Sequence, residues 1–228
     1  MSTARAKGYT LYGSHNSGAV AVEAALDLCK ARYRFVDTPS WRSKTARAKV
    51  ERVNPLGQIP TLVCPDGSVL TESAAILIHL ALAHPRARLL PSEPVQRAQA
   101  LRALVFIAAN CYAAIGAIDY PERWLGRASA KEDRDTLRAG ARKRLHQLWS
   151  VFADEFGTNR KSKGPYLFGE RITAADLLAA VVSRWSGARK HLAKKHPALH
   201  ATLERIDAHP AMAAVFERRW LAAPAPAP

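Results

Sequence analysis

The first part of the chain alternates between short runs of β-favouring residues and segments with helical spacing. Four such runs predict strands at residues 9–12, 33–37, 61–64 and 69–70. Apolar residues that recur every three or four positions predict helices at residues 19–30, 42–53 and 74–83. The resulting order is βαβ, a short helix, and then ββα, which is the plan of a thioredoxin-like domain over residues 9–84.

The pattern changes after this domain. Residues 85–94 are rich in proline and predict a linker, and no strand signal follows. Helical spacing recurs in four segments, at residues 95–120, 131–156, 173–186 and 200–207. We therefore expect a two-domain protein of the α+β/α type, with an all-helical domain over residues 95–221. A polar leader (1–8) and an Ala/Pro tail (222–228) are expected to be flexible.

Composition narrows the class of protein. Apolar residues make up 48% of the 228 residues and charged residues 23%, as in ordinary globular proteins. The longest apolar run, Ala103–Ile118, includes Asn110 and predicts a buried helix, not a membrane span. Glu23 interrupts the nearest candidate for a signal peptide, so we expect a cytoplasmic protein without membrane contact. The three cysteines of the chain lie far apart in sequence, without a CxxC motif or the spacing of metal ligands. Neither a redox dithiol nor a bound metal is therefore expected.

The net charge of +15 is unusual. Lysines and arginines cluster at residues 42–52, 142–144, 160–163 and 184–195. Such a field attracts anions, acidic small molecules and nucleic acid. A nucleic-acid surface also needs exposed aromatic side chains among the basic ones, and only Trp185 meets that condition. A solvated basic surface without a specific partner is the simpler interpretation, and a nucleic-acid partner is the less favoured one.

The turn before the first helix holds Ser14, Asn16 and Ser17. A helix N-terminus carries partial positive charge and unpaired N–H groups, so a thiolate near it is stabilised, and a hydroxyl can donate a further hydrogen bond. The same residue types are also the preferred helix caps. From the turn alone, the structural interpretation is favoured over the chemical one.

Two later segments also allow both a structural and a ligand-binding interpretation. In Gln58-Ile59-Pro60, a cis Ile59–Pro60 bond would expose the Ile59 main chain to a peptide-like ligand, whereas a trans proline would simply begin a strand. Glu72 and Ser73, at a predicted helix start, suit an ammonium group and a carboxylate, or serve only as a cap. Thr173 with Asp176 forms a capping box, which is structural.

Taken together, these segments resemble the glutathione transferase superfamily. The matching stretches are residues 11–14 with Ser17, residues 54–62, residues 70–76 and residues 169–176. The resemblance covers nearly the whole chain after residue 8, and the two middle stretches match in both sequence and spacing. It implies a cis Pro60, glutathione as co-substrate, and a cytosolic enzyme that is a homodimer.

The resemblance also assigns roles to residues. Ile59 would bind the cysteinyl backbone of glutathione between Gln58 and Pro60, Glu72 and Ser73 would bind its γ-glutamyl end, and Lys44 is matched more loosely to the glycyl carboxylate. Ser17 is the first candidate to face the sulfur, with Ser14 and Asn16 as competitors. No cysteine occupies this turn, which disfavours mixed-disulfide chemistry. For the second substrate, the helical domain offers Phe106, Tyr112 and Trp124.

Three functions follow from the resemblance. The first is transfer of glutathione to a hydrophobic or acidic electrophile, as in detoxification. The second is a glutathione-dependent reductase, isomerase or ether-cleaving enzyme, which the sequence does not separate from the first. The third is a non-catalytic interaction module with a basic surface, for which the residues at positions 59–60 and 72–73 would not be needed.

Overall fold

A computed structural model describes residues 8–157 and 164–221 of the chain. The predicted leader (except Gly8), the Ala/Pro tail and the basic cluster at 160–163 lie outside the described residues. The chain divides into two compact units, Met1–Leu90 with Asp207–Pro228, and Pro91–Ile206. This division differs from the predicted helical domain of residues 95–221, because the last helix packs within the first unit.

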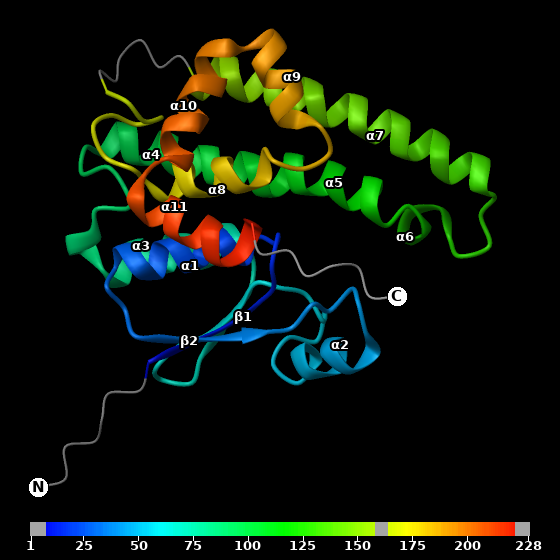
Figure 1. Ribbon diagram of the computed structural model, residues 1–228, viewed down its shortest axis with the longest axis horizontal. Helices are drawn as coiled ribbons and strands as arrows, with labels where there is room; N and C mark the ends of the chain where they lie inside the picture. The colour runs from blue at the N-terminus through cyan, green and yellow to red at the C-terminus, as the bar shows by residue number, and fades with distance from the viewer. Residues whose placement is uncertain (1–7, 158–163, 222–228) are drawn as a thin grey trace, which may run out of the picture. The chain divides into compact units, whose positions relative to one another are not determined.

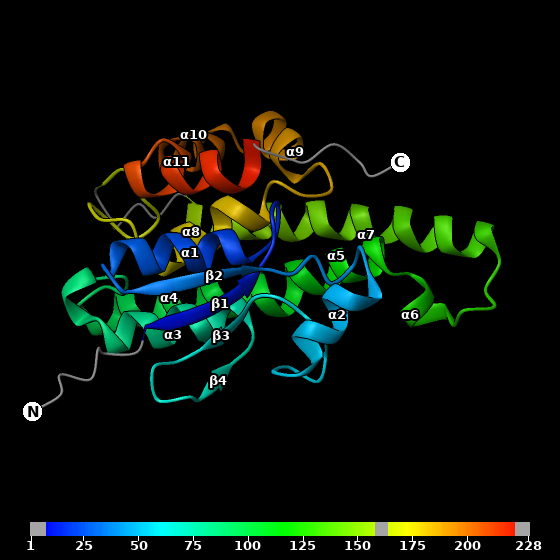
Figure 2. The ribbon, with the colours of Figure 1, turned by 60° about the horizontal axis from the view of Figure 1, so that its bottom comes forward.

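The first unit is a four-stranded sheet with helices. Its elements are β1 (Tyr9–Gly13), α1 (Ala19–Leu28), β2 (Tyr33–Asp37), α2 (Lys44–Glu51), β3 (Thr61–Val63), β4 (Val69–Leu70), α3 (Ser73–Ala83), the short 3₁₀ turn η1 (Pro85–Ala87), α11 (Pro210–Phe216) and the π-turn η4 (Glu217–Leu221). The strand order is β2-β1-β3-β4, with β1 parallel to β2 and the other pairs antiparallel (Figure 2). The predicted thioredoxin-like βαβ-ββα plan is confirmed.

Local chemistry explains these connections. The small and branched side chains of α1 are buried from Ala19 to Leu26, which fits a crossover helix between parallel strands. The β3–β4 turn is held by Asp66, whose Oδ1 accepts hydrogen bonds from the Ser68 N–H at 2.9 Å and the Ser68 hydroxyl at 2.7 Å. Gly67 adopts φ +91° there, a conformation that favours glycine. A tight hairpin therefore brings β4 back beside β3.

The last helix is the main element of this unit that the periodicity did not predict. Helix α11 lies along α1 and continues into η4 (Figures 1 and 2). It has seven residues and begins at Pro210, so the sequence offers too short a window for a period to emerge. Its buried side chains, Met212, Val215 and Phe216, add to the core of the first unit.

The second unit is entirely helical in its described residues, apart from a single β-bridge between Tyr166 and Gly169. Its elements are α4 (Pro94–Phe106), the π-turn η2 (Ile107–Cys111), α5 (Tyr112–Asp119), α6 (Glu122–Leu125), α7 (Lys131–Phe152), the π-turn η3 (Ala153–Gly157), α8 (Ala174–Val182), α9 (Ala188–Lys195) and α10 (Pro197–Asp207). Helix α7 packs against α5 and α9 (Figure 1). Trp149, Phe152 and Phe156 are fully buried and form its aromatic core.

The predicted capping box is present at the start of α8. Both the Thr173 hydroxyl and the Thr173 N–H donate to Asp176 Oδ2, at 2.6 and 2.8 Å, and the Leu167 N–H donates to Oδ1 at 2.9 Å. Every residue of α8 is buried. The capping box therefore supplies hydrogen-bond partners at the first turn of a buried helix, where water is not available.

Elements α4, η2 and α5 form one continuous helix, Pro94–Asp119, where a single helix over 95–120 was predicted. By length and composition this helix could cross a membrane, because an 18-residue window of it has a mean hydropathy of 1.8, and 33% of that window is buried. Core helices of soluble proteins meet the same criterion, and this one packs against α7 and α8 within its unit. We interpret it as a core helix.

Candidate functional site

The pairing registers of the sheet bring three segments to one of its ends. Tyr12 of β1 pairs with Thr61 of β3, and Leu62 pairs with Leu70 of β4. Gly13 and Pro60 lie one step further along the first register, and Pro60 and Glu72 lie two steps further along the second. The first turn, the Ile59–Pro60 bond and the start of α3 therefore meet at the same end of the sheet, as a site built from all three would require.

Gly13 sets the distance between β1 and α1. A Cβ atom at this position would collide with the side chains of Ala19 and Phe35. Glycine therefore lets the N-terminus of α1 begin close to the end of β1, and it brings the first-turn residues next to that helix end.

Ser17 is the centre of the first turn. Its hydroxyl donates to the Ser14 carbonyl oxygen at 2.7 Å, and Ser17 Oγ accepts from the N–H groups of Ser14 and Ala19, both at 3.3 Å. The Ser17 hydroxyl is therefore engaged within the turn and must rotate before it can donate to a ligand. Ser14 is buried as well, and its own hydroxyl has no hydrogen-bond partner among the described residues.

Asn16 has an unusual backbone and an unsatisfied side chain. Its φ is +54°, a left-handed conformation that asparagine tolerates better than most residues. The Asn16 N–H donates to the Arg219 carbonyl oxygen at 3.0 Å, so η4 holds this conformation. Asn16 Oδ1 is buried without a hydrogen-bond partner in the described chain. Such a buried acceptor calls for a donor from elsewhere.

The predicted cis bond between Ile59 and Pro60 is present. Buried Asn54 anchors the preceding loop, because its Nδ2 donates to the Gln58 carbonyl at 3.0 Å and to Thr61 Oγ1 at 3.1 Å. Over residues 8–157 and 164–221, neither the N–H nor the C=O of Ile59 has a hydrogen-bond partner. A donor and an acceptor on one residue are what an extended peptide ligand pairs with.

The start of α3 combines strain with unpaired donors. Glu72 has φ +64° and ψ 113°, outside the regions that a residue with a side chain normally occupies. Its carboxylate is exposed and does not cap the helix. Ser73 is the first residue of α3 and is buried, and no partner of its hydroxyl is found within the described segments. A strained residue at a helix N-terminus is typical of a binding site.

Lys44 lies apart from this arrangement in the chain. It is the first residue of α2, where Ser43 Oγ caps the helix by accepting from the Ala46 N–H at 3.1 Å. The Lys44 side chain is exposed. No pairing register connects it to the end of the sheet, so its role stays a prediction.

The three residues expected to line a second pocket lie in the helical unit and have different neighbours. Phe106 packs against Phe152 and Phe156, with ring centroids 6.0 Å from each. Tyr112 meets Trp185 edge to face at 5.7 Å. Trp124, in α6, is 64% exposed. Among these, only Trp124 presents most of its ring to solvent, and the pocket itself stays a prediction.

The sequence interpretation missed the contact that connects the turn to the end of the chain. Glu23 is one of two acids in helix α1, the other being Asp27, and the Glu23 side chain is buried. Arg219 donates to both of its carboxylate oxygens, at 2.7 and 3.1 Å. The available signal was an acid inside the apolar run of residues 19–26, which predicts a basic partner but not its position in the chain. Within the described residues, no group of three or more His, Cys, Asp or Glu is arranged to hold a metal ion.

Comparison with known proteins agrees with this geometry. The family model "Glutathione S-transferase, N-terminal domain" matches residues 19–83, and "Glutathione S-transferase, C-terminal domain" matches residues 124–219. The chain is 29% identical over 212 residues to the uncharacterized GST-like protein YncG of Escherichia coli (strain K12), covering 91% of this chain and 97% of YncG.

Two further similarities extend over most of the chain. The maleylacetoacetate isomerase of Rhizobium meliloti (strain 1021) is 31% identical over 163 residues, 71% of this chain and 73% of the isomerase. A glutathione transferase homologue from Sulfitobacter, solved with bound glutathione, has the same fold with a TM-score of 0.78; it is 24% identical, and the match covers 92% of this chain and 98% of that one. The chain therefore belongs to the glutathione S-transferase superfamily.

Proposed function

We propose that this protein is a glutathione transferase that binds glutathione at the end of its sheet and activates the thiol for attack on a hydrophobic or acidic electrophile. The observation that supports this most directly is the unpartnered main chain of Ile59, beside the cis Pro60. An extended tripeptide can satisfy both groups at once through its cysteinyl N–H and C=O.

The remaining contacts follow from the chemistry of glutathione. The Ser73 N–H and hydroxyl at the start of α3 receive the γ-glutamyl carboxylate, where the helix dipole favours negative charge. The Glu72 carboxylate receives the neighbouring ammonium group. Gln58 lies beside the peptide, and Lys44 meets the glycyl carboxylate.

The first turn then activates the sulfur. The pKa of a free thiol is about 8.5, and it must fall by about two units for the thiol to be mostly thiolate at neutral pH. This shift corresponds to about 2.7 kcal/mol of stabilisation of the thiolate. A hydrogen bond to a charged group supplies about 1.5–3 kcal/mol, and a helix N-terminus adds about 0.3–1 kcal/mol. The Ser17 hydroxyl, turned away from the Ser14 carbonyl, is therefore sufficient, and no charged base is required. Ser14 and Asn16 are the competing donors.

The chemical step is a nucleophilic attack by sulfur. The thiol proton leaves to solvent, and the thiolate pair forms a carbon–sulfur bond with the electrophile. A leaving group departs with the electron pair of its bond, or an activated double bond accepts the pair and is protonated. The electrophile is expected to contact the helical domain at Phe106, Tyr112 and Trp124.

The test is steady-state kinetics of Ser17→Ala, Ser14→Ala and Asn16→Ala with glutathione and an aromatic halide. Loss of the thiolate hydrogen bond should lower kcat of Ser17→Ala by about 10-fold to 100-fold and move its pH–rate profile up by about one to two units. KM for glutathione should change little, because Ile59 and Ser73 remain. Unchanged turnover in Ser17→Ala with loss in Ser14→Ala would transfer the role to Ser14.

A second candidate uses the same site. Similarity to a maleylacetoacetate isomerase favours a glutathione-dependent isomerase, in which the thiolate adds to an activated double bond and leaves after rotation. Isomerisation of a cis-dienoic diacid without net consumption of glutathione would favour it over transfer. Reduction of a disulfide substrate would favour a reductase, and an interaction module would bind no glutathione.

A further inference from the structure

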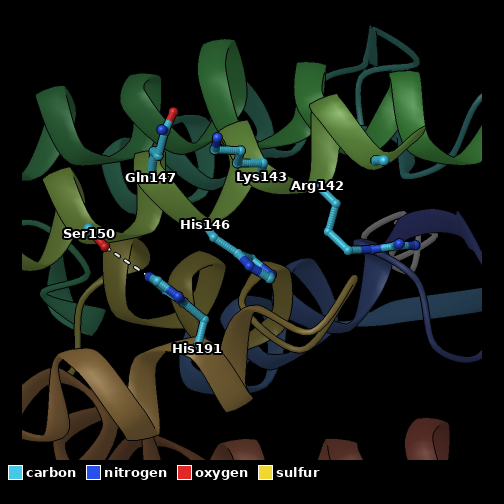
Figure 3. A pocket seen from close by; sticks show the side chains of 7 residues that line it. Arg142, Lys143, His146, Gln147, Ser150 and His191 are labelled. Carbon is cyan, nitrogen blue, oxygen red and sulfur yellow. Dashed lines mark hydrogen bonds between the residues drawn. The ribbon is translucent and has the colours of Figure 1, made fainter. Parts of the chain in front are cut away.

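A hollow lies between α7 and α9, entirely within the helical unit (Figure 3). Its volume is about 740 Å³, and its lining includes Arg142, Lys143, His146 and Ser150 from α7 and His191 from α9. A second hollow of about 570 Å³ shares Arg142, His146 and His191 with it and adds Lys190. The two hollows therefore form one shallow concave surface that is open to solvent.

The charged side chains of the lining are all basic. Arg142, Lys143 and Lys190 carry positive charge, and no carboxylate lines either hollow. None of the three forms an ion pair in the described part of the chain. Two basic clusters that lie apart in the sequence, at 142–144 and 184–195, thus meet at one concave surface. Unpaired cations in a hollow concentrate anions more strongly than the same charges on a flat surface.

Two histidines that line this hollow are held in fixed positions. The rings of His146 and His191 stack with centroids 4.8 Å apart and planes 13° from parallel (Figure 3). His146 Nε2 carries a hydrogen and donates it to the Ser186 carbonyl at 3.1 Å, because that oxygen can only accept. His191 Nε2 lies 2.9 Å from Ser150 Oγ. Both rings are therefore held in place, as in a built binding site.

Protonation of His191 is opposed in the free protein. Burial lowers the pKa of His191, and the neighbouring charges of His146, His196 and Lys195 lower it further. Lys190, Arg142 and Lys143 also line the hollows. Two acids lie near their rim: Asp154 is 3.7 Å from His196, and the charge of Arg142 lowers the pKa of Asp119 in part, against the effect of burial. A bound anion would offset this repulsion and favour proton uptake by His191.

We infer that the hollow lined by Arg142, Lys143, Lys190, His146 and His191 binds a compact, multiply charged anion of the phosphate class. Arginine and lysine donors match the acceptor oxygens of such a group. The Nε2 atoms of His146 and His191 already contact Ser186 and Ser150, so protonation of His191 would add a donor at Nδ1. This anion hollow uses none of the residues proposed to bind glutathione, so it is a separate site. A concave surface of this size fits a small phosphorylated molecule better than an extended nucleic-acid strand, which needs stacking aromatics along its path.

The test is calorimetric titration of the full chain with inorganic pyrophosphate at fixed, moderate ionic strength. We expect one site per chain. Arg142→Gln/Lys190→Gln should weaken binding roughly tenfold or more, because it removes two charged donors. The matched control is Arg144→Gln/Lys194→Gln, which removes the same charge from the same two clusters but lies outside the lining. The control should bind as the wild type does, with thermal melts verifying that both variants are folded.

A second arm tests the histidine pair with sulfate, whose charge is constant over the range used. Sulfate should bind more tightly at about pH 6 than at about pH 8, and His191→Gln should reduce that difference. Equal loss of pyrophosphate affinity in both double variants would mean a diffuse basic surface and would overturn the proposal. Absence of saturable binding, or binding of single-stranded RNA that pyrophosphate does not displace, would overturn it as well.

Discussion

Glu23 and Arg219 are 196 positions apart in the chain, and their side chains form a two-point ion pair on the surface of α1, with distances of 2.7 and 3.1 Å. Tyr33 also donates to the Glu23 carboxylate at 3.0 Å, and the Arg219 guanidinium lies over the Phe35 ring, 3.7 Å from its centroid. The main-chain oxygen of Arg219 accepts from the Asn16 N–H. Arg219 thus supports the first turn and, together with Arg218 at 3.5 Å, neutralises a buried acid.

Removal of either charge from this pair should destabilise the protein. Arg219→Met removes the two-point partner of Glu23 and leaves Arg218, 3.5 Å away, as its only basic neighbour among the ion pairs of the described residues. We expect a loss of about 1.5–3 kcal/mol in the free energy of unfolding, measured by urea denaturation. The double variant Glu23→Gln/Arg219→Met should lose less than the sum of the two single variants. Additive losses would show that the two side chains do not stabilise each other.

The strained backbone of Glu72 predicts that substitutions at this position change stability and glutathione affinity in different ways. Glycine adopts φ +64° without cost, so Glu72→Gly should leave the protein as stable as the wild type or more stable by up to about 1 kcal/mol. It also removes the carboxylate proposed to bind the ammonium group, so glutathione affinity should fall about tenfold. Glu72→Gln keeps the strained backbone and should weaken binding without the gain in stability. Loss of stability in Glu72→Gly would contradict this explanation.

Asp176 predicts a pH dependence of stability in the helical unit. Burial raises the pKa of its carboxyl to about 6, although hydrogen bonds from Thr173 and Leu167 lower it in part. Between about pH 4 and pH 6 the folded chain therefore holds more of this proton than the unfolded chain, and the contribution of Asp176 to stability falls as pH rises through about 6.

Asp176→Asn removes this titration and serves as the comparison. The free energy of unfolding of the wild type minus that of the variant should decrease as the pH rises from about 4 to about 7. Urea titrations at a series of pH values measure this difference. A difference that increases over the same range would mean that the hydrogen bonds outweigh burial at this carboxyl.

Two cysteines are predicted to be unreactive in the folded protein. Burial raises the pKa of Cys29 to about 11 and that of Cys111 to about 12. Little thiolate is then present near neutral pH, and thiolate is the nucleophilic form. Alkylation by iodoacetamide, followed by peptide mass spectrometry, should modify both residues far more slowly in the native protein than in urea. Rapid native modification of Cys111 would contradict its burial.

The strands and helices of the first unit could be predicted because local signals agree there. Alternation, helical spacing and the turn at Asp66 and Gly67 all indicate the observed elements, and the box of Thr173 and Asp176 predicts the start of α8. The cis bond before Pro60 could not be derived locally, because most such bonds are trans, and it depended on the family resemblance.

Other features lie outside what periodicity reveals. Helix α9 buries only Ala188 and Leu192, and its remaining basic side chains hide that narrow stripe in the sequence. The π-turn at Ile107–Cys111 adds one residue to a helical turn, which a reading at a fixed period does not detect. The contacts of Arg219 with Asn16 and Glu23 depend on the tertiary fold, so no local pattern gives their position.

Calorimetric titration of the full chain with reduced glutathione tests the central claim most directly. We predict saturable binding at one site per chain, in the micromolar to low-millimolar range, which Ser73→Ala and Glu72→Gln weaken and Arg142→Gln/Lys190→Gln does not. Absence of binding up to several millimolar would contradict a glutathione site at the end of the sheet. It would leave the anion hollow to be tested by itself, because pyrophosphate binding there depends on different residues.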